Sequence, residues 1–219
     1  MTTSLPLHYV KQGTGSPLLL IHGIGANWQT WQPVLDTLAQ HHTVYAVDSA
    51  GFGQSPSLPG HMVTMAQHAD AYEHWMDAQG LAQAHISGNS MGGGLALELA
   101  KRGRALTCAP ISPVGFWRPS SASVIRRTLG SSHSQAKHFL PLARLLCRSA
   151  LGRKMIFRFA VAKPEQLTVQ QAQDMVTVMA RCDFTPSLRG LVAETSTGLA
   201  SITCPVTVLW GTRDTLLPY

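Results

Sequence analysis

Gly88-Asn89-Ser90-Met91-Gly92 is the stretch of this 219-residue chain that bears most directly on its fold. It lies between an apolar segment and a helix-like run at residues 95–100. A G-x-S-x-G pattern in that setting predicts a strand that turns sharply into a helix and leaves the serine at the apex, strained and exposed. Gly88 and Gly92 fit this turn because a Cβ at either position would collide with the crossing backbone. The pattern therefore predicts an activated serine at Ser90.

The start of the following helix would add electrostatic stabilisation at this serine. The N–H of Met91 and the positive end of the helix dipole would both point at an oxyanion formed beside Ser90. The alternative is a glycine-rich turn with an incidental serine, such as a phosphate cradle. The pentapeptide alone leaves that alternative open, although a P-loop lysine and the G-x-G-x-x-G spacing are both missing here.

Three further segments combine a short apolar strand with a glycine turn. Residues 18–21 run into His22-Gly23-Ile24-Gly25, which is a natural second oxyanion donor. Residues 43–47 run into a turn that begins at Asp48 and contains Gly51 and Gly53. Residues 206–210 lead into Gly211-Thr212-Arg213-Asp214, which places an acid just past a strand end.

With these four motifs in this order, the chain resembles the α/β-hydrolase family over essentially its whole length. The resemblance implies an α/β fold with a mostly parallel central sheet flanked by helices and an inserted helical cap. It implies that Ser90 is the nucleophile and Asp214 the acid of a catalytic triad. The backbone N–H groups of Ile24 and Met91 would form the oxyanion hole. The glycines of the elbow and of the oxyanion loop would be Gly23, Gly88 and Gly92.

The chain departs from the family pattern after Asp214. The family order is serine, acid and then histidine, with one further strand before the histidine. No histidine follows Asp214, and His138 is the last one in the chain. We therefore expect that a C-terminal strand and helix of the family core, together with the base, are missing from these 219 residues.

Two functions remain under comparison. The first is a serine hydrolase of the esterase or lipase type, which acts on a carboxylic ester or related acyl substrate through an acyl-enzyme at Ser90. The second is a catalytically impaired fragment, or a non-enzymatic ligand-binding protein, on the same scaffold. Serine rather than aspartate at the elbow argues against epoxide hydrolases and haloalkane dehalogenases, and the architecture implies neither a metal nor an organic cofactor.

Several other polar residues have simpler structural explanations. His22 belongs to a H-G pair that, in this family, shapes the oxyanion loop. Asp48 stands at a strand end, where a carboxylate can accept backbone N–H bonds from the following turn. His85 is most simply a core or edge histidine. We expect His68 and His74 to face solvent or a groove edge, because the apolar stripe of their helix falls on other residues. That stripe consists of Met65, Ala69, Tyr72 and Met76.

The distribution of strand and helix patterns predicts three segments. Residues 1–112 read as the first part of the core, with strands near His8, Leu18, Val44, Ile86 and Leu106. Residues 113–200 read as a helical cap with a return helix near residues 188–199. Residues 201–219 continue the core with a strand over residues 206–210 and the acid loop.

Within the predicted cap, two stretches have helical periodicity. One carries Leu142, Leu145 and Leu146, with Pro141 in its first turn and Gly152 as its C-cap. The other runs from residue 170 to 181.

Positive charge is concentrated in one part of the chain. Between residues 101 and 163 there is no Asp or Glu, whereas the whole chain has a formal net charge of +6. We favour a solvated cap face as the explanation. A sharper alternative is a weak contact with anionic substrates or with an anionic membrane surface, since Arg144 and Arg148 lie opposite the leucine stripe. Nucleic acid is disfavoured, because neither a basic recognition helix nor interleaved aromatic residues are present.

The remaining composition is that of a cytoplasmic α/β protein, and the resemblance implies a small-molecule acyl substrate. Hydrophobic residues make up 45% of the chain, and neither a membrane span nor a signal-peptide pattern is visible. The cysteines are widely spaced, which predicts reduced thiols rather than a metal site. We also expect self-association through an unpaired edge of the sheet at residues 206–210.

Overall fold

The computed structural model describes residues 5–116, 119–212, 214, 216 and 217. The strands are β1 (Tyr9–Gln12), β2 (Ser16–Ile21), β3 (His42–Val47), β4 (Ala84–Asn89) and β5 (Ala105–Ile111). The α-helices are α1 (Gln32–Leu38), α2 (Met65–Ala78), α3 (Met91–Lys101), α4 (Pro119–His138), α5 (Leu140–Leu146), α6 (Ala150–Phe157), α7 (Val169–Arg181) and α8 (Phe184–Ala193). Short 3-10 helices are η1 (Trp28–Trp31), η2 (Pro164–Gln166) and η3 (Leu199–Ser201).

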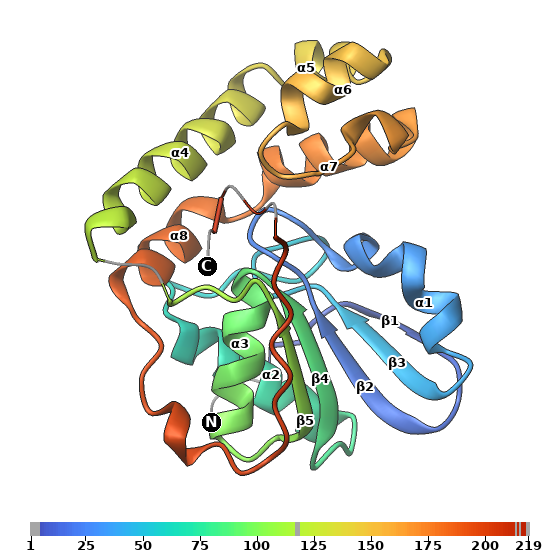
Figure 1. Cartoon of the computed structure of the whole chain (residues 1–219), viewed down its shortest axis with the longest axis vertical. Coiled ribbons are helices and arrows are strands. Elements are labelled where there is room, and N and C mark those ends of the chain that lie inside the picture. Colours follow the sequence, from blue (N-terminus) through green and yellow to red (C-terminus); the bar gives the residue numbers. More distant parts are fainter. Residues whose placement is uncertain (1–4, 117–118, 213, 215, 218–219) are drawn as a thin grey trace.

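The five strands form one sheet in the order β1-β3-β2-β4-β5 (Figure 1). The pairs β3–β2, β2–β4 and β4–β5 are parallel, and only β1 is antiparallel to its neighbour β3. Each parallel pair is joined through a crossover, as expected when helices cover a sheet. The predicted α/β fold with a mostly parallel sheet is confirmed.

Helices cover both faces of the sheet, and β2 shows how its residues divide between them. Leu19 and Ile21 point to the face that is covered by α2 and α3. Leu18 and Leu20 point to the opposite face, where they pack with Trp31 and with Leu35 of α1. Successive side chains of a strand alternate between faces, so a continuous apolar run indicates a strand that is buried on both sides.

Residues 205–209 extend the sheet beyond β5. The N–H groups of Thr207 and Leu209 donate to the carbonyls of Cys108 and Pro110, both at 2.9 Å. The segment runs parallel to β5 but makes only isolated bridges, at Val206 and Leu209. The predicted strand is thus present as a parallel edge segment rather than as a full strand.

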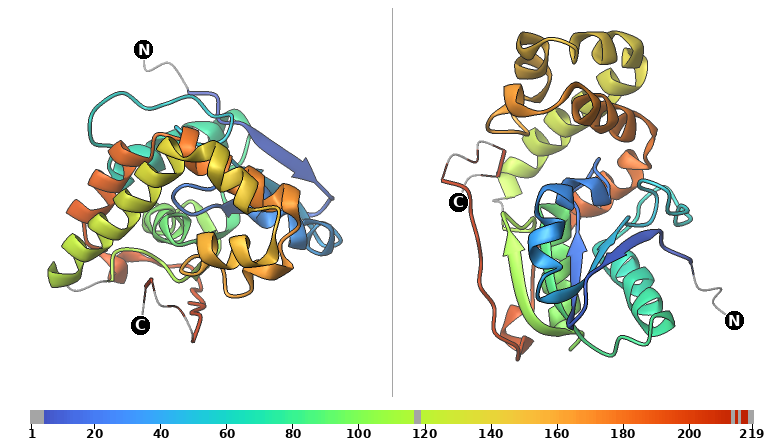
Figure 2. Two further views of the ribbon diagram at one scale, coloured as in Figure 1. Left: turned by 90° about the horizontal axis from the view of Figure 1, so that it is seen from above. Right: turned by 90° about the vertical axis from the view of Figure 1, so that its right-hand side faces the viewer.

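Helices α4 to α8 lie between β5 and this edge segment in sequence, and most of them gather beyond the carboxyl ends of the strands (Figure 2). Helix α8 returns to the core and packs against the segment before α2. The N–H of Val63 donates to the carbonyl of Pro186 at 3.0 Å, and a Cβ at Gly190 would lie 2.0 Å from the carbonyl oxygen of Val63.

Two helix boundaries in this region differ from the sequence-based prediction. Gly152 is not a C-cap, because it lies inside α6. Ser149 is the N-cap of α6, and its hydroxyl accepts the N–H of Gly152 at 2.9 Å, so α5 ends early and a second helix begins. The return helix spans Phe184–Ala193 rather than residues 188–199, of which only Leu199–Ser201 form a separate 3-10 turn.

None of the helices that the structure describes has an apolar stretch long enough to cross a bilayer.

Candidate active site

Ser90 occupies the turn between β4 and α3 in a backbone conformation that L-residues rarely adopt. Its φ is +55° and its ψ is −113°. The N–H of Ser90 donates to the carbonyl of Ile111 at 2.9 Å, and its own carbonyl accepts N–H bonds from Gly94 at 3.1 Å and Val114 at 3.2 Å. These bonds from β5, α3 and the following loop maintain the strained turn.

The glycines of the elbow are required by close backbone contacts. A Cβ at Gly88 would lie 2.1 Å from the carbonyl oxygen of Gly92. A Cβ at Gly92 would lie 2.2 Å from the carbonyl oxygen of Ile21. The helix therefore starts directly against the ends of β2 and β4, which brings the loop after β2 next to Ser90.

That loop contains Gly23 and Ile24. A Cβ placed on Gly23 would lie 3.4 Å from the Cβ of Ser90, so the two backbones are in van der Waals proximity. Within the part of the chain that the structure describes, the N–H groups of Ile24 and Met91 have no hydrogen-bond partner. The structure thus brings together Ser90, Gly23, Ile24 and Met91.

Residues of α7 and α8 pack onto the same loop, a contact that was not predicted from the sequence. Gly25 has a φ of +76°, and a Cβ there would meet the sulfur of Met179 and the ring of Phe184. The ring of Phe184 is stacked on the imidazole of His133 from α4, with centroids 4.8 Å apart. These contacts are long-range and leave no local pattern in the sequence.

His22 has both ring nitrogens engaged. Its Nδ1 lies 2.7 Å from the carbonyl oxygen of Gly23 and donates to it, while Nε2 accepts the N–H of Ser49 at 2.9 Å. Complete burial lowers the pKa of His22 despite the hydrogen bond to Gly23, so the imidazole is neutral. The prediction that His22 is a structural residue is confirmed.

Asp48 is the hub of the neighbouring turn. Its carboxylate accepts the N–H of Trp28 at 2.7 Å and of Gln54 at 3.0 Å, and it lies 2.8 Å from Nδ1 of His8. Gly53 is essential to this packing, because a Cβ there would lie 2.1 Å from the carboxylate. The predicted role of Asp48 as an acceptor for the turn is confirmed.

The expectation for His68 was wrong. His74 is exposed as predicted, but His68 is 1% exposed, and its Nε2 lies 3.2 Å from the hydroxyl of Ser187. Helix α8 covers the side of α2 that the apolar stripe left to solvent, and this contact joins segments 119 residues apart. Burial lowers the pKa of His68 to about 4, with a further contribution from nearby His22.

His85 lies on the inner strand β4 and is half-buried, with Nδ1 2.8 Å from the hydroxyl of Thr107.

Asp214 lies at the same edge of the sheet as Ser90, two strands away. It follows the edge segment, whose Leu209 is the parallel partner of Ile111, and Ile111 in turn is paired with Asn89 of β4. One carboxylate oxygen of Asp214 accepts the N–H groups of Leu216 at 3.0 Å and Leu217 at 2.8 Å. The structure does not place Asp214 in hydrogen-bond contact with Ser90.

Among the described residues, no histidine lies within hydrogen-bond distance of the Ser90 hydroxyl. His133 of α4 stacks on Phe184, whose ring lies next to Gly25, and desolvation lowers the pKa of His133, with the charge of Lys137 acting in the same direction. Its Nε2 is buried without a partner in the described part of the chain.

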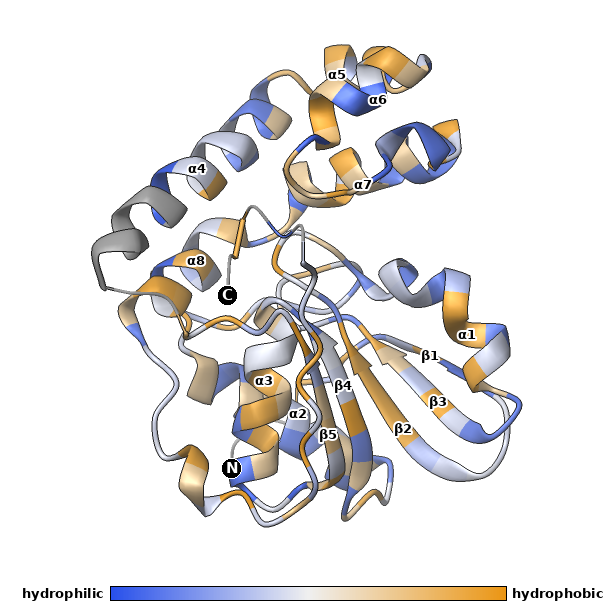
Figure 3. Ribbon diagram, viewed as in Figure 1, coloured by the Kyte–Doolittle hydropathy of each residue, from blue (hydrophilic) through white to orange (hydrophobic). Residues whose placement is uncertain are grey.

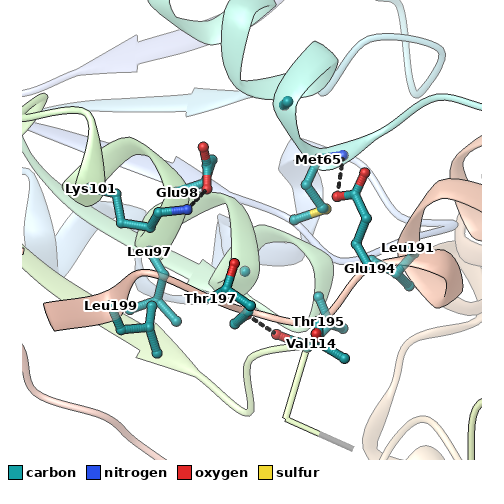
Figure 4. A pocket seen from close by; sticks show the side chains of 14 residues that line it. Met65, Leu97, Glu98, Lys101, Val114, Leu191, Glu194, Thr195, Thr197 and Leu199 are labelled. Atoms are coloured by element: carbon teal, nitrogen blue, oxygen red, sulfur yellow. Dashed lines mark hydrogen bonds and ion pairs between the residues drawn. The ribbon is translucent and has the colours of Figure 1, made fainter. Parts of the chain in front are cut away.

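A hollow of about 390 Å³ lies on the side of α3 away from the sheet (Figure 4). Its lining includes Glu98 and Lys101, which form an ion pair at 2.6 Å, and Glu194, whose carboxylate accepts the N–H of Met65 at 3.3 Å. Ser90 does not line it. We therefore do not assign this hollow to the acyl group.

The cysteines are unpaired thiols, as predicted. Burial raises the pKa of Cys108 and of Cys182 to about 12, so both are protonated and unreactive at neutral pH. Within the described ranges, no three His, Cys, Asp or Glu side chains gather in a way that would hold a metal ion.

Curated proteins of known name are similar to this chain in sequence. The dihydrolipoyllysine-residue acetyltransferase component of the acetoin cleaving system of Cupriavidus necator is 32% identical over 219 residues, which cover 97% of this chain and 56% of that protein. The pimeloyl-(acyl-carrier protein) methyl ester esterase of Aliivibrio salmonicida is 29% identical over 237 residues, with coverage of 100% and 81%. The chain spans between 56% and 64% of the length of the first curated relatives it matches.

Solved structures of several hydrolases have the same fold. A hydrolase from Pseudomonas aeruginosa superimposes with a TM-score of 0.74 at 21% identity, covering 100% of this chain and 84% of that one. A thermophilic esterase from Thermogutta terrifontis superimposes with a TM-score of 0.74 at 24% identity. The match covers 97% of this chain and 77% of the esterase. The model of the alpha/beta hydrolase family matches residues 18–219. This chain therefore belongs to the alpha/beta hydrolase family.

Proposed function

We propose that the protein hydrolyses a carboxylic ester or related acyl substrate, with Ser90 as the nucleophile. The observation that carries this proposal is the conformation of Ser90, with a φ of +55° at a strand-to-helix turn, next to two backbone N–H groups that have no partner among the described residues. Relatives named as an esterase and as a lipase support the ester class of substrate.

The hydroxyl oxygen of Ser90 would attack the carbonyl carbon of the ester. The N–H groups of Ile24 and Met91 would donate to the oxyanion as the tetrahedral intermediate forms, where charge develops in the transition state. Collapse of that intermediate would expel the alcohol and leave an acyl group on Ser90, and water would then release the acid. Both steps need a base that takes a proton and returns it to the leaving group.

Asp214 would orient this base and stabilise it when it is protonated. No histidine follows Asp214 in the 219 residues, and none that the structure describes contacts Ser90. Loss of the triad histidine costs roughly 10⁶ in rate in a serine protease, and oxyanion and binding catalysis leaves about 10³ over water. We therefore expect only weak turnover of activated esters by these 219 residues.

Imidazole rescue tests the proposal. Hydrolysis of p-nitrophenyl butyrate is followed at increasing imidazole concentrations for the unchanged chain, for Ser90→Ala and for Ser132→Ala, whose serine is exposed on α4. After subtraction of the rate without protein, we expect an imidazole-dependent rate that Ser132→Ala retains and Ser90→Ala loses. Equal rates for all three proteins would contradict the role of Ser90.

The second candidate function is ligand binding without turnover. It is favoured by one specific observation, the lack of an imidazole that contacts Ser90 among the described residues. Its expected signature is saturable binding of an ester without any release of alcohol, including in the presence of imidazole.

A further inference from the structure

The apolar side chains that remain exposed are concentrated in one short part of the cap. Around α5 and α6, within residues 139–159, seven large hydrophobic side chains are exposed. They are Phe139, Leu142, Leu145, Leu146, Leu151, Met155 and Phe159. We call this set the cap patch. In Figure 3, α5 and α6 lie at the end of the molecule farthest from α3, and apolar and charged residues alternate along them.

Helices α5 and α6 form a helical hairpin, and the exposure of the cap patch does not result from poor packing of this hairpin. The inner face of the hairpin is buried, because Cys147 is 0% and Phe157 is 7% exposed, and both pack with Ala172 and Val176 of α7. Two arginines stabilise the same inner side. Arg144 donates to the hydroxyl of Thr177 at 2.9 Å, and Arg153 donates to the carbonyl of Cys147 at 2.9 Å. The hairpin is therefore apolar on two sides, and only one of them faces the protein.

Exposed apolar residues form a stripe along α6, with Leu151 and Met155 in the helix and Phe159 in the turn after its end at Phe157. Leu151, Met155 and Phe159 follow each other at intervals of four, and they are 69%, 61% and 54% exposed. Residues four apart on a helix lie on one side of it. Lys154 and Arg158 are also exposed, directly beside this stripe, and the Arg158 guanidinium lies 4.3 Å from the centroid of the Phe159 ring.

The charged residues of the chain segment that carries the cap patch are all basic. Between residues 126 and 163 there are nine Lys and Arg residues and no Asp or Glu. The one ion pair in this stretch of the described chain joins Lys154 to Glu165 across 4.0 Å. Arg102, by contrast, is paired with Asp70 and Glu73 at 2.6 Å and with Glu98 at 3.1 Å, so it adds nothing to the field of the cap.

We propose that the cap patch binds the surface of an anionic lipid bilayer. Exposed leucine, methionine and phenylalanine side chains would enter the boundary between headgroups and acyl chains, and the adjacent basic side chains would lie among the anionic headgroups. Charge complementarity selects this occupant, because a second copy of the same patch would bring Lys154 and Arg158 against residues of the same charge. The proposal does not depend on the chemistry of Ser90.

Vesicle co-sedimentation tests it. The protein is mixed with vesicles of phosphatidylcholine alone or with added phosphatidylserine, at low and at high salt. We expect binding to the anionic vesicles, weakened by salt because screening shortens the range of the headgroup attraction. Joint replacement of Lys154 and Arg158 by Gln is expected to lower the partition coefficient about fivefold for each charge removed.

Leu151→Ser and Met155→Ser test the apolar contribution to vesicle binding. Each is expected to lower the partition coefficient roughly tenfold. Met62→Ser is the matched control, because Met62 is 48% exposed on a loop next to α2 and outside the patch. Arg181→Gln is the control for charge, and Ser90→Ala should bind as tightly as the unchanged chain. Circular dichroism checks that each variant is folded.

Absence of sedimentation with anionic vesicles would overturn the proposal, as would equal binding to both kinds of vesicle. Light scattering in the absence of lipid measures whether the protein forms an oligomer through this patch, which is a further outcome that would overturn the proposal. If Leu151→Ser and Met155→Ser dissociate an oligomer of the protein, the patch is an interface between copies of this chain rather than a lipid-binding surface.

Discussion

His68 and His74 lie on one helix, yet their environments differ completely. His74 is exposed, whereas His68 is buried between α2 and α8 beside Ser187, with a pKa lowered to about 4. The folded state therefore resists protonation of His68, while the unfolded chain binds a proton near pH 6.5. As the pH falls from about 6.5 to about 4, the unfolded state takes up this proton first, and the free energy of unfolding decreases.

We predict that His68 accounts for about 3 kcal/mol of lost stability over that range. Urea unfolding at pH 7 and at pH 4 measures it for the unchanged chain, for His68→Gln and for His74→Gln. The pH-dependent loss should shrink by about this amount in His68→Gln and stay the same in His74→Gln. Equal losses in both variants would show that His68 is not protected from solvent.

At the scale of elements, the close packing of α3 against β2 and β4 is what positions Ser90. Gly92→Ala would place a Cβ 2.2 Å from the carbonyl oxygen of Ile21, a backbone atom that cannot move without shifting β2. We expect this variant to lose about 3 kcal/mol or more of stability, at the upper end for overpacked cores.

Gly130→Ala is the matched control for that substitution. Gly130 lies inside α4, and the nearest atom to an added Cβ is 3.9 Å away. Replacement of an unconstrained helical glycine by alanine favours the helix by about 0.5 to 1 kcal/mol. Urea denaturation should therefore shift in opposite directions for the two variants. Equal stability of Gly92→Ala and the unchanged chain would refute the close approach.

Elements whose signal is local could be predicted from the sequence, and those fixed by distant contacts could not. Strands β2 and β3 and the elbow at Ser90 follow from short strand segments that end in glycine turns, because that pattern is contained in each segment. The interruption between α5 and α6 also has a local cause, the N-cap Ser149. It was not predicted, because the leucines before Ser149 suggest one longer helix. The burial of His68 depends on α8, which is more than a hundred residues away.

In the candidate site too, residues that belong to short motifs could be predicted from the sequence, whereas contacts from distant helices could not. Ser90, Met91 and Ile24 were identified from short motifs, and the structure brings them together. The packing of Met179 and Phe184 onto the oxyanion loop was not predicted, since nothing in the sequence of α7 or α8 specifies which loop they cover. The roles of Ser90 and Asp214 stay predictions that chemistry must test.

At the scale of the whole molecule, the edge segment at residues 205–209 has a neighbouring strand on one side only within the part of the chain that the structure describes. Val206, Val208 and Leu209 are between 39% and 53% exposed, and the described hydrogen bonds of this segment run to β5 and to Ser112 directly after it. Such an edge is a template for pairing with another chain. We propose that these residues mediate self-association.

The prediction is a weight-average mass that rises with protein concentration, measured by size-exclusion chromatography with light scattering. Val208→Lys should reduce this rise, because a charge on an edge strand opposes pairing. Met155→Ser, which lies in the cap patch, should leave it unchanged. A monodisperse monomer at all concentrations, with no effect of Val208→Lys, would contradict the role of the edge.

The central claim is that Ser90 is an activated nucleophile, and labelling by a fluorophosphonate tests it most directly. Strain at the elbow and the two oxyanion donors do not depend on a triad base, so covalent reaction should occur even where turnover is weak. Peptide mapping by mass spectrometry is predicted to find the phosphonate on Ser90, with labelling lost in Ser90→Ala and retained in Ser132→Ala. Absence of a Ser90 adduct, or equal labelling of Ser90→Ala, would contradict the account.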